Sequence, residues 1–314
     1  MFQLIPTTLN IDFLKISKPF VWASTFFVVA SIVLLFTKGL NYGIDFTGGA
    51  EVQVEVPKEW DTAKLRETLQ AGGMNEPTVV RIEDAAKQEF LIKSQVKDSS
   101  TTNVGEQVEK ILAAAIPAGQ FQILKVDVVG PQAGEELRYS AIISVLAAAL
   151  GILIYITFRF DFRFAPGIVR ALLFDVVTTL GVWILLGKEF NLSTVAALLT
   201  IAGYSCNDTI VIYDRIRDFS KDHKGASMYD IVNRSINLNL GRTFLTVICT
   251  NFVVVSLWLL GGPVLGDFAL AMLIGFSVSV FSTIFVANPM VMFMENRRVN
   301  QETSAPGARK EKHA

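Results

Sequence analysis

The chain has 314 residues, of which 51% are hydrophobic and only 18% are charged. This composition is far from that of an average soluble domain and indicates an integral membrane protein. A formal net charge of −1 gives no electrostatic basis for binding nucleic acid. The two cysteines, Cys206 and Cys249, lie within apolar runs, and the two histidines lie in polar segments. The sequence therefore predicts neither a metal site nor a disulfide framework.

The N-terminal region combines a short mixed segment, residues 1–19, with a first apolar run at 20–37. The run is long and aromatic enough to approach a bilayer span. A cleaved signal peptide is the competing interpretation, but no small-residue cleavage site follows the run. Because Lys15 and Lys18 precede it, we expect a retained transmembrane helix with a cytoplasmic N-terminus.

Residues 38–137 form the one long polar stretch and predict a folded domain outside the membrane. Residues 50–56 alternate apolar and polar side chains, as a half-exposed strand does. The further predicted elements are a helix at 61–71 capped by Asp61, strands at 78–83 and 89–94, a helix at 103–116 and a strand at 122–129. The order β-α-β-β-α-β is the ferredoxin-like plan.

Five more apolar runs follow, so the sequence predicts six transmembrane helices. The later spans are expected at 138–158, 168–187, 193–213, 243–262 and 267–293. Basic residues concentrate after the second and fourth spans and in the tail at 294–314, whereas the other two short turns hold only Lys188.

This charge bias places both termini in the cytoplasm and the polar domain on the far side of the membrane. Residues 214–242 then form a cytoplasmic loop, and the polar tail is expected to be disordered. The predicted fold class is a polytopic α-helical membrane protein with a periplasmic α+β ferredoxin-like domain between its first two helices.

Asp208 lies inside the fourth predicted span, where an ionisable side chain costs roughly 2.5–3.5 kcal/mol on insertion scales. Such groups usually mark ion or proton paths, although a structural carboxylate that joins helices is the plainer alternative. Arg242, at the entrance of the fifth span, is predicted to pair with Asp208 in a switchable proton relay, with Asn207 orienting the carboxylate. Arg242 is equally interpretable as a residue that anchors the helix end at the membrane surface. Asp175 in the third span is either a second relay group or an interfacial residue solvated by the neighbouring loop.

Two glycine-containing motifs flank the polar domain. The stretch at 43–49 reads GIDFTGG, with three glycines in seven residues, and it lacks the Gly-Lys-Ser/Thr ending of a phosphate loop. We predict a tight junction with its counterpart at 129–131, able to act as a hinge between membrane helix and sheet. The residues assigned to this junction are Gly43, Asp45, Phe46, Gly48, Gly49, Gly130 and Pro131.

The stretch Gly203–Arg217, GYSCNDTIVIYDRIR, resembles the fourth-helix signature of the SecF family. The motifs at 43–49, 129–131 and 239–243 resemble other motifs of that family and occur in the family's order. The resemblance implies a fold like that of the resistance–nodulation–division transporters. It also implies pairing with SecD and association with the SecYEG channel and YajC in the bacterial inner membrane.

In this family the proton-motive force drives late steps of preprotein translocation, with the unfolded preprotein on the periplasmic side. The family's relay aspartate and arginine fall on Asp208 and Arg242. The resemblance thus implies a translocase subunit and no enzyme, with protons as the coupling ion, sodium as the open alternative, and no cofactor.

Three other functions compete with this one. A proton-coupled small-molecule exporter of the same superfamily normally has larger outside domains and twice the spans. An intramembrane aspartyl protease would use Asp175 and Asp208 as a dyad, but Arg242 would hold one carboxylate ionised. The last alternative is a scaffold that transports nothing, for which Asp208 would be dispensable.

Overall fold

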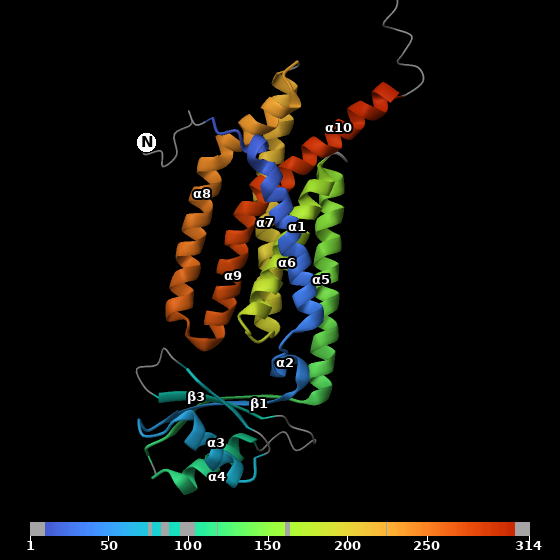
Figure 1. The fold of residues 1–314 in the computed structure, drawn as a ribbon. Helices are drawn as coiled ribbons and strands as arrows, with labels where there is room; N and C mark the ends of the chain where they lie inside the picture. The colour runs from blue at the N-terminus through green and yellow to red at the C-terminus, as the bar shows by residue number, and fades with distance from the viewer. Residues whose placement is uncertain are drawn as a thin grey trace, which may run out of the picture. The chain divides into compact units, whose positions relative to one another are not determined.

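The computed structural model describes residues 10–74, 77–82, 88–94, 104–117, 119–160, 164–223 and 225–304. The chain divides into two compact units (Figure 1). The helical unit comprises Met1–Gly39, Leu146–Lys188 and Ala196–Ala314. The sheet unit comprises Leu40–Val145 and Glu189–Val195, so it includes a short segment from between two membrane helices.

The sheet unit has the predicted β-α-β-β-α-β order. Its elements are α2 (Ile44–Thr47), β1 (Gly49–Val56), α3 (Thr62–Ala71), β2 (Thr78–Arg81), β3 (Gln88–Ser94), α4 (Val104–Ala115) and β4 (Gln122–Val129). The strands form one antiparallel sheet in the order β2-β3-β1-β4, and Val52 of β1 pairs with Ile92 on one side and Val126 on the other. This topology confirms the ferredoxin-like prediction.

The core of the sheet unit follows from the alternation of side chains along β1. Ala50, Val52, Val54 and Val56 are all buried, because successive strand side chains point to opposite faces of a sheet. Helices α3 and α4 cover this face, as Figure 1 shows, and bury their leucines against it. The predicted cap of α3 is present: Asp61 Oδ1 accepts a hydrogen bond from the Lys64 amide at 2.7 Å.

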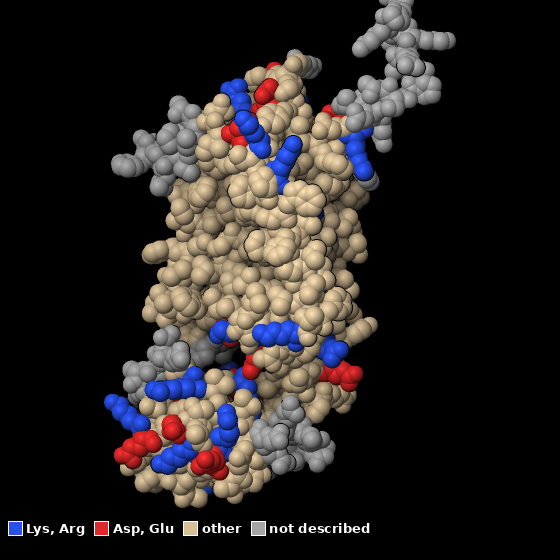
Figure 2. All heavy atoms as spheres, viewed as in Figure 1, with Lys and Arg blue, Asp and Glu red and all other residues tan. Residues whose placement is uncertain are grey.

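The helical unit contains most of the membrane-spanning segments, although α5 and α7 each begin in the sheet unit. They are α1 (Phe13–Thr37), α5 (Pro131–Arg159), α6 (Ala165–Leu185), α7 (Leu192–Asp222), α8 (Met228–Leu260) and α9 (Gly262–Ser282), which continues through the π-helical turn η2 (Thr283–Ala287) into α10 (Asn288–Ser304). Six helical segments of the described chain are long and apolar enough to cross a membrane. On the face seen in Figure 2 a broad uncharged band surrounds the middle of these helices, and charged side chains gather at their ends. The chain is a multi-pass membrane protein, as predicted.

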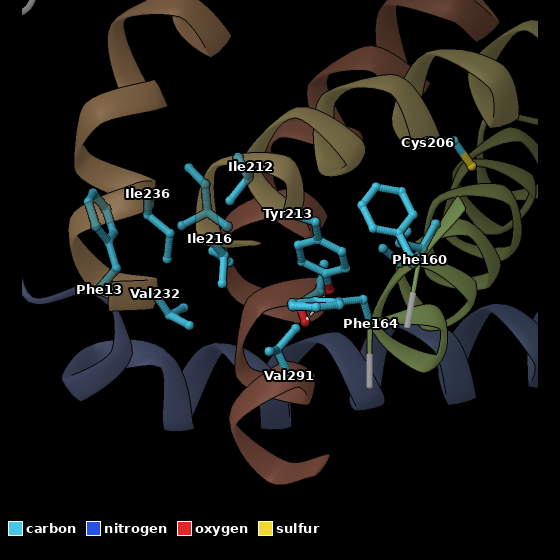
Figure 3. Close-up of a cluster of buried hydrophobic side chains, with 14 of the residues drawn as sticks. Phe13, Phe160, Phe164, Cys206, Ile212, Tyr213, Ile216, Val232, Ile236 and Val291 are labelled. Atoms are coloured by element: carbon cyan, nitrogen blue, oxygen red, sulfur yellow. Dashed lines mark hydrogen bonds between the residues drawn. The ribbon is translucent and has the colours of Figure 1, made fainter. Parts of the chain in front are cut away.

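Two polar segments are more helical than predicted. Most of 214–242 is not a loop, because α7 extends to Asp222 and α8 begins at Met228. The physical reason is an apolar inner face, including Ile216, Val232 and Ile236, that joins the main core of the helical unit (Figure 3). The tail at 294–314 begins as a continuation of α10, and residues 305–314 lie outside the described residues, as do residues 1–9.

A buried tyrosine organises that core. Tyr213 has no exposed surface, its ring contacts Phe160 and Phe164, and its hydroxyl donates a 2.9 Å hydrogen bond to the Ala287 carbonyl (Figure 3). A Cβ at Gly167 would come within 2.1 Å of the Tyr213 hydroxyl oxygen, so α6 approaches this ring closely only because glycine stands there. The contact fixes α6, α7 and η2 together, which sets the frame for the polar groups described below.

Glu51 on β1 is an acidic residue that lies partly buried in the sheet unit. Burial raises the pKa of the Glu51 carboxyl, and its ion pair with Lys93 at 3.3 Å opposes this only in part. A raised pKa means that the folded state binds the proton more tightly than the unfolded state. The stabilising contribution is therefore complete below the ordinary pKa of 4.5 and is lost as the pH rises through the folded-state pKa.

We predict that Glu51→Gln stabilises β1 relative to wild type at neutral pH, with the difference vanishing in acid. The measurement is hydrogen exchange of β1 amides in the full-length protein, expressed as the ratio of variant to wild-type rates at each pH, which cancels the intrinsic pH dependence. Glu67→Gln, an exposed position on α3, is the matched control and should give a flat ratio. A flat ratio for Glu51→Gln as well would contradict the prediction.

Candidate proton-relay site

Asp208 lies where three elements of the helical unit meet. It is half-buried on α7, and its Oδ1 accepts a 3.0 Å hydrogen bond from Thr243 Oγ1 on α8. The hydroxyl of Thr283, in the π-helical turn, also lies within hydrogen-bonding reach of the carboxylate. A membrane carboxylate is stabilised by such donors because hydrocarbon supplies none. The donors come from helices that are distant in sequence, so packing alone assembles the site.

Arg242 interacts with Asp208 electrostatically, but the two side chains do not form the predicted direct ion pair. The two side chains, both within the described residues, make no ion pair, and Thr243 takes the place beside the carboxylate. The reason is helical geometry: consecutive residues are rotated by about 100° around the helix axis. Thr243 is turned inward and is buried, whereas Arg242 is turned outward and is exposed.

A polar cavity of about 260 Å³ lies between α7 and α8 beside Arg242. Its charged lining residues besides Arg242 are Asp214, Arg215 and Asp218. Arg159 holds Asp214 in place with two hydrogen bonds of 2.8 and 2.7 Å to its two carboxylate oxygens. Water in this cavity would reach the guanidinium of Arg242 directly. Arg242 would then lie between that water and Asp208.

Asn207 does not share the surroundings of Asp208. It is exposed on α7, although it adjoins Asp208 in sequence, and its side chain makes no hydrogen bond among the described residues. The predicted role of orienting the carboxylate falls to Thr243 instead. An exposed amide on a spanning helix nevertheless marks a face that lipid would solvate poorly.

Asp175 is fully buried, so the interpretation of this residue as an interfacial, loop-solvated group is wrong. Ser205 on α7 and Ser282 at the end of α9 both donate hydrogen bonds to its Oδ2, the latter at 2.8 Å. The other carboxylate oxygen, Oδ1, has no partner among the described residues. Asp175 and Asp208 share no hydrogen bond, and the dyad that an aspartyl protease requires is not formed.

Hydroxyl groups occupy the space between the two carboxylates. Thr209 Oγ1 lies 3.2 Å from the Ser205 carbonyl, to which it donates, and 3.3 Å from Thr283 Oγ1. Ser205 and Thr283 in turn are neighbours of Asp175 and Asp208 respectively. The buried polar groups thus run from α6 through α7 and η2 to α8. A π-helical turn is uncommon and frequently occurs at functional sites.

Sequence reasoning missed the hydroxyls Ser205, Thr209, Thr243 and Thr283. One signal was present, because Ser205 and Thr209 flank Asp208 within the same short stretch and lie one turn apart. The others give no local signal, since serine and threonine are common in membrane helices and usually bond to their own backbone.

The junction motif binds the turn between α6 and α7. The Gly43 amide donates to the Phe190 carbonyl at 2.9 Å, the Phe190 amide donates to the Asn41 carbonyl at 2.7 Å, and the rings of Phe46 and Phe190 stack at 5.7 Å. Asp45 Oδ2 accepts a 2.8 Å hydrogen bond from the amide of Leu192, the first residue of α7. A carboxylate is favourable at that position because helix N-termini carry free amides and partial positive charge.

Glycine is required where the two halves of the junction meet. Gly48 has φ of 72°, and a Cβ there would come within 2.8 Å of Pro131 Cα. In the other direction, a Cβ at Gly134 would come within 2.9 Å of the Gly48 nitrogen. The motifs at 43–49 and 129–131 are therefore in backbone contact, as the prediction of a matched junction required. The hinge movement itself stays a prediction.

The fold and the enclosed carboxylates define a multi-pass membrane protein of a transporter-like class. Residues 107–297 match the family described as protein export membrane protein SecD/SecF, C-terminal, and residues 33–56 match the SecD/SecF GG motif. The chain therefore belongs to the SecD/SecF family of protein-export membrane proteins.

Individual relatives agree with this assignment. Protein translocase subunit SecF of Magnetococcus marinus is 42% identical over 96% of this chain and 98% of its own length. Protein translocase subunit SecDF of Thermus thermophilus is 38% identical over 91% of this chain and 39% of its own length. The crystal structure of SecDF from that organism, titled a translocon-associated membrane protein, superposes with a TM-score of 0.82 at 35% identity, over 93% of this chain and 39% of that chain. A second SecDF structure, in a super-membrane-facing form, has a TM-score of 0.70 over 97% of this chain and 41% of that chain.

We predict that Gly48→Ala destabilises the sheet unit more than Gly73→Ala. Both glycines have positive φ, 72° and 90°, which costs an L-residue roughly 1–2 kcal/mol. A Cβ at Gly73 would meet no described atom within 4 Å, whereas at Gly48 it collides with the backbone of Pro131. The measurement is the urea concentration at which β1 amides lose protection from hydrogen exchange. Equal shifts for the two variants would show that the close approach to Pro131 contributes nothing.

We predict that Asp45→Ala frays the first turn of α7. Loss of a capping carboxylate costs about 1 kcal/mol, so exchange of the Leu192 amide should accelerate about fivefold. Asp45→Asn keeps an oxygen acceptor and should restore most of the protection. Asp61→Ala removes the corresponding cap of α3 and should accelerate exchange there but not in α7. If Leu192 exchanges at the wild-type rate in Asp45→Ala, the cap is unimportant in solution.

Proposed function

We propose that this chain is the SecF-type subunit of a protein-export translocase and couples proton movement to late steps of preprotein translocation. Its place would be a bacterial inner membrane, with both termini in the cytoplasm and the sheet unit in the periplasm. Family membership, the names of the relatives and the basic residues of alternate loops support this proposal. The proposed role is transport, with no enzymatic step and no cofactor.

The proposed partner is a SecD-type chain with spans of its own. In the Thermus thermophilus relative a SecF-like sequence occupies 39% of a longer chain named SecDF, which supports physical association of the two parts. The surface of this chain gives a second reason. Asn207 and Arg242 are exposed on α7 and α8, and polar groups on spanning helices are costly against lipid unless other helices cover them. We further propose, on family resemblance alone, that SecYEG, YajC and an unfolded preprotein in the periplasm are partners.

The observation that supports proton coupling best is the enclosure of Asp208. Its carboxylate lies between hydroxyls of α8 and η2, and the neighbouring Arg242 faces a polar cavity. In the ionised state the carboxylate would be stabilised by Thr243 and by the positive field of Arg242. On taking up a proton, Asp208 becomes neutral and both interactions weaken. Proton uptake and release would therefore change how strongly α7 and α8 attract each other.

We propose that Asp175 is a second protonation site in this path. It is fully buried, its Oδ1 lacks a partner among the described residues, and no cation faces it there. The neutral acid is the favoured state of an unpaired buried carboxyl group. Ser205, Thr209 and Thr283 lie between Asp175 and Asp208 and can reorient their hydroxyls as proton positions change. Carboxylate and hydroxyl oxygens also suit sodium, so the coupling ion needs a direct test.

Coupling to the sheet unit would pass along α7. This helix is continuous from Leu192 to Asp222, and it carries Asp208 while its first amide is held by Asp45 of the junction motif. A shift of α7 that follows protonation of Asp208 would then displace the 43–49 motif, whose last residue is the first residue of β1.

We predict that Asp208→Asn abolishes the proton-driven part of preprotein export, since the amide cannot exchange a proton. The measurement is export into vesicles that contain this chain, its SecD-type partner and the channel, with and without a proton gradient and with sodium varied separately. Export driven by ATP alone should be unchanged. Full stimulation by the proton gradient in Asp208→Asn would refute the relay. Stimulation by sodium alone would show that sodium, and not the proton, is the coupling ion.

Two threonine-to-valine variants separate the role of the Thr243 hydroxyl from the general effect of losing a hydroxyl group in a membrane helix. Thr243→Val removes a hydrogen bond to a charged group, worth about 1.5–3 kcal/mol, and should shift the pH profile of gradient-driven export. Thr200→Val on α7 loses only a hydroxyl bonded to its own helix, at 2.8 Å from the Ala196 carbonyl, and should leave the profile unchanged.

A further inference from the structure

A second cavity of about 620 Å³ opens on the surface of the helical unit between α1, α5 and α6. It is separate from the relay groups and from the cavity beside Arg242. Several of its apolar lining side chains, among them Val29, Leu153 and Leu173, are about half exposed. All three helices are long and apolar enough to span a membrane, so hydrocarbon is the surrounding that the groove would meet unless another protein covers it.

The walls of this groove present almost no open hydrogen-bonding groups. The hydroxyls of Ser24, Thr25 and Thr157 all donate to backbone carbonyls one turn earlier in their own helices, at 2.8, 2.9 and 2.7 Å. The rest of the lining, apart from one residue, is aliphatic, aromatic or proline. The body of the groove therefore suits an apolar occupant.

The exception is Arg170 of α6, the single charged residue in the described lining. Its one hydrogen bond among the described residues runs from Nη1 to the sulfur of Met290 at 3.9 Å, and methionine sulfur is a weak acceptor. A guanidinium has five N–H donors in a planar fork that matches phosphate oxygens, so most of its binding capacity is free. A cation with open donors at an apolar groove favours an amphipathic ligand with an anionic end.

The height of the groove distinguishes a lipid from a partner helix. Its lining on α6 runs from Ala165 to Phe174, and nine residues of α-helix rise about 14 Å. That is about one leaflet of a hydrocarbon core roughly 30 Å thick, whereas a spanning helix would need a groove through both leaflets. Arg170 lies in the N-terminal half of α6, toward the end of the helix that enters the membrane.

We propose that this groove binds one anionic phospholipid, with an acyl chain against α1, α5 and α6 and the phosphate on Arg170. Basic pockets between membrane helices bind acidic lipid headgroups in this way. The inference is independent of proton coupling, because no group of the relay contributes to the groove. A lipid held here would contact α1, α5 and α6 at once, because all three helices line the groove.

The test is retention of lipid by the full-length protein. Wild type and variants are reconstituted in vesicles of phosphatidylcholine mixed with phosphatidylglycerol, extracted in mild detergent, and analysed by native mass spectrometry. Wild type should retain phosphatidylglycerol in preference to phosphatidylcholine. Arg170→Gln should lower this preference about fivefold, the contribution of one basic residue to binding acidic lipid. Val169→Trp, which fills the groove and keeps the charge, should lower retention of both lipids.

Arg66→Gln is the matched control, because it removes the same charge from the exposed face of α3 in the sheet unit. It should leave lipid retention at the wild-type level, and thermal unfolding of each variant checks that the fold is intact. Equal phosphatidylglycerol retention in wild type and Arg170→Gln would overturn the proposal. So would loss of lipid in the control variant, or a bound polypeptide in place of lipid mass.

Discussion

The helical unit depends on one physical constraint: a carboxyl group within hydrocarbon must find hydrogen-bond donors inside the protein. Asp175 and Asp208 meet it with hydroxyls from neighbouring helices and, among the described residues, with no direct ion pair. A direct guanidinium–carboxylate pair is strong, and breaking one by removing a partner is expensive. Hydroxyls bind both the ionised and the neutral acid, since they donate and accept. A hydroxyl-lined carboxyl group can therefore change protonation state without the helices coming apart.

The packing around the two carboxyl groups also determines where helix α7 is held. Tyr213 ties α7 to the carbonyl of Ala287, the last residue of the π-helical turn. Thr283, the first residue of that turn, lies beside Asp208, and Ser282, just before it, donates to Asp175. The start of α7 is held by Asp45 and by the Gly43–Phe190 hydrogen bonds of the junction. The same helix is thus fixed at its first turn and lined with titratable groups at its middle. The glycine-rich motif, which matches the SecD/SecF GG motif, therefore holds the start of α7 in place.

Two surfaces of the helical unit differ in what they require from their surroundings. Asn207 and Arg242 are exposed on α7 and α8, where neighbouring helices would satisfy an amide and a guanidinium better than lipid does. The groove beside Arg170 is apolar along its walls and cationic at one point, which matches an acidic lipid. We propose that other helices cover the first region, whereas an acidic lipid fills the second.

The sequence by itself determined the six spans and the ferredoxin-like sheet and singled out Asp208 as a candidate, because each leaves a local signal: hydropathy, alternation of side chains, or a charge within an apolar run. It also predicted that 43–49 and 129–131 meet. Only the tertiary structure decided what surrounds those groups. Thr243 rather than Arg242 faces the carboxylate, Asp175 is buried rather than solvated, and most of 214–242 is helical with an inward apolar face. The binding of the junction to the Phe190 turn likewise had no sequence signal. Rotation about a helix axis and contacts across long sequence separations set these features, and both follow from packing between helices, which no single stretch of sequence encodes.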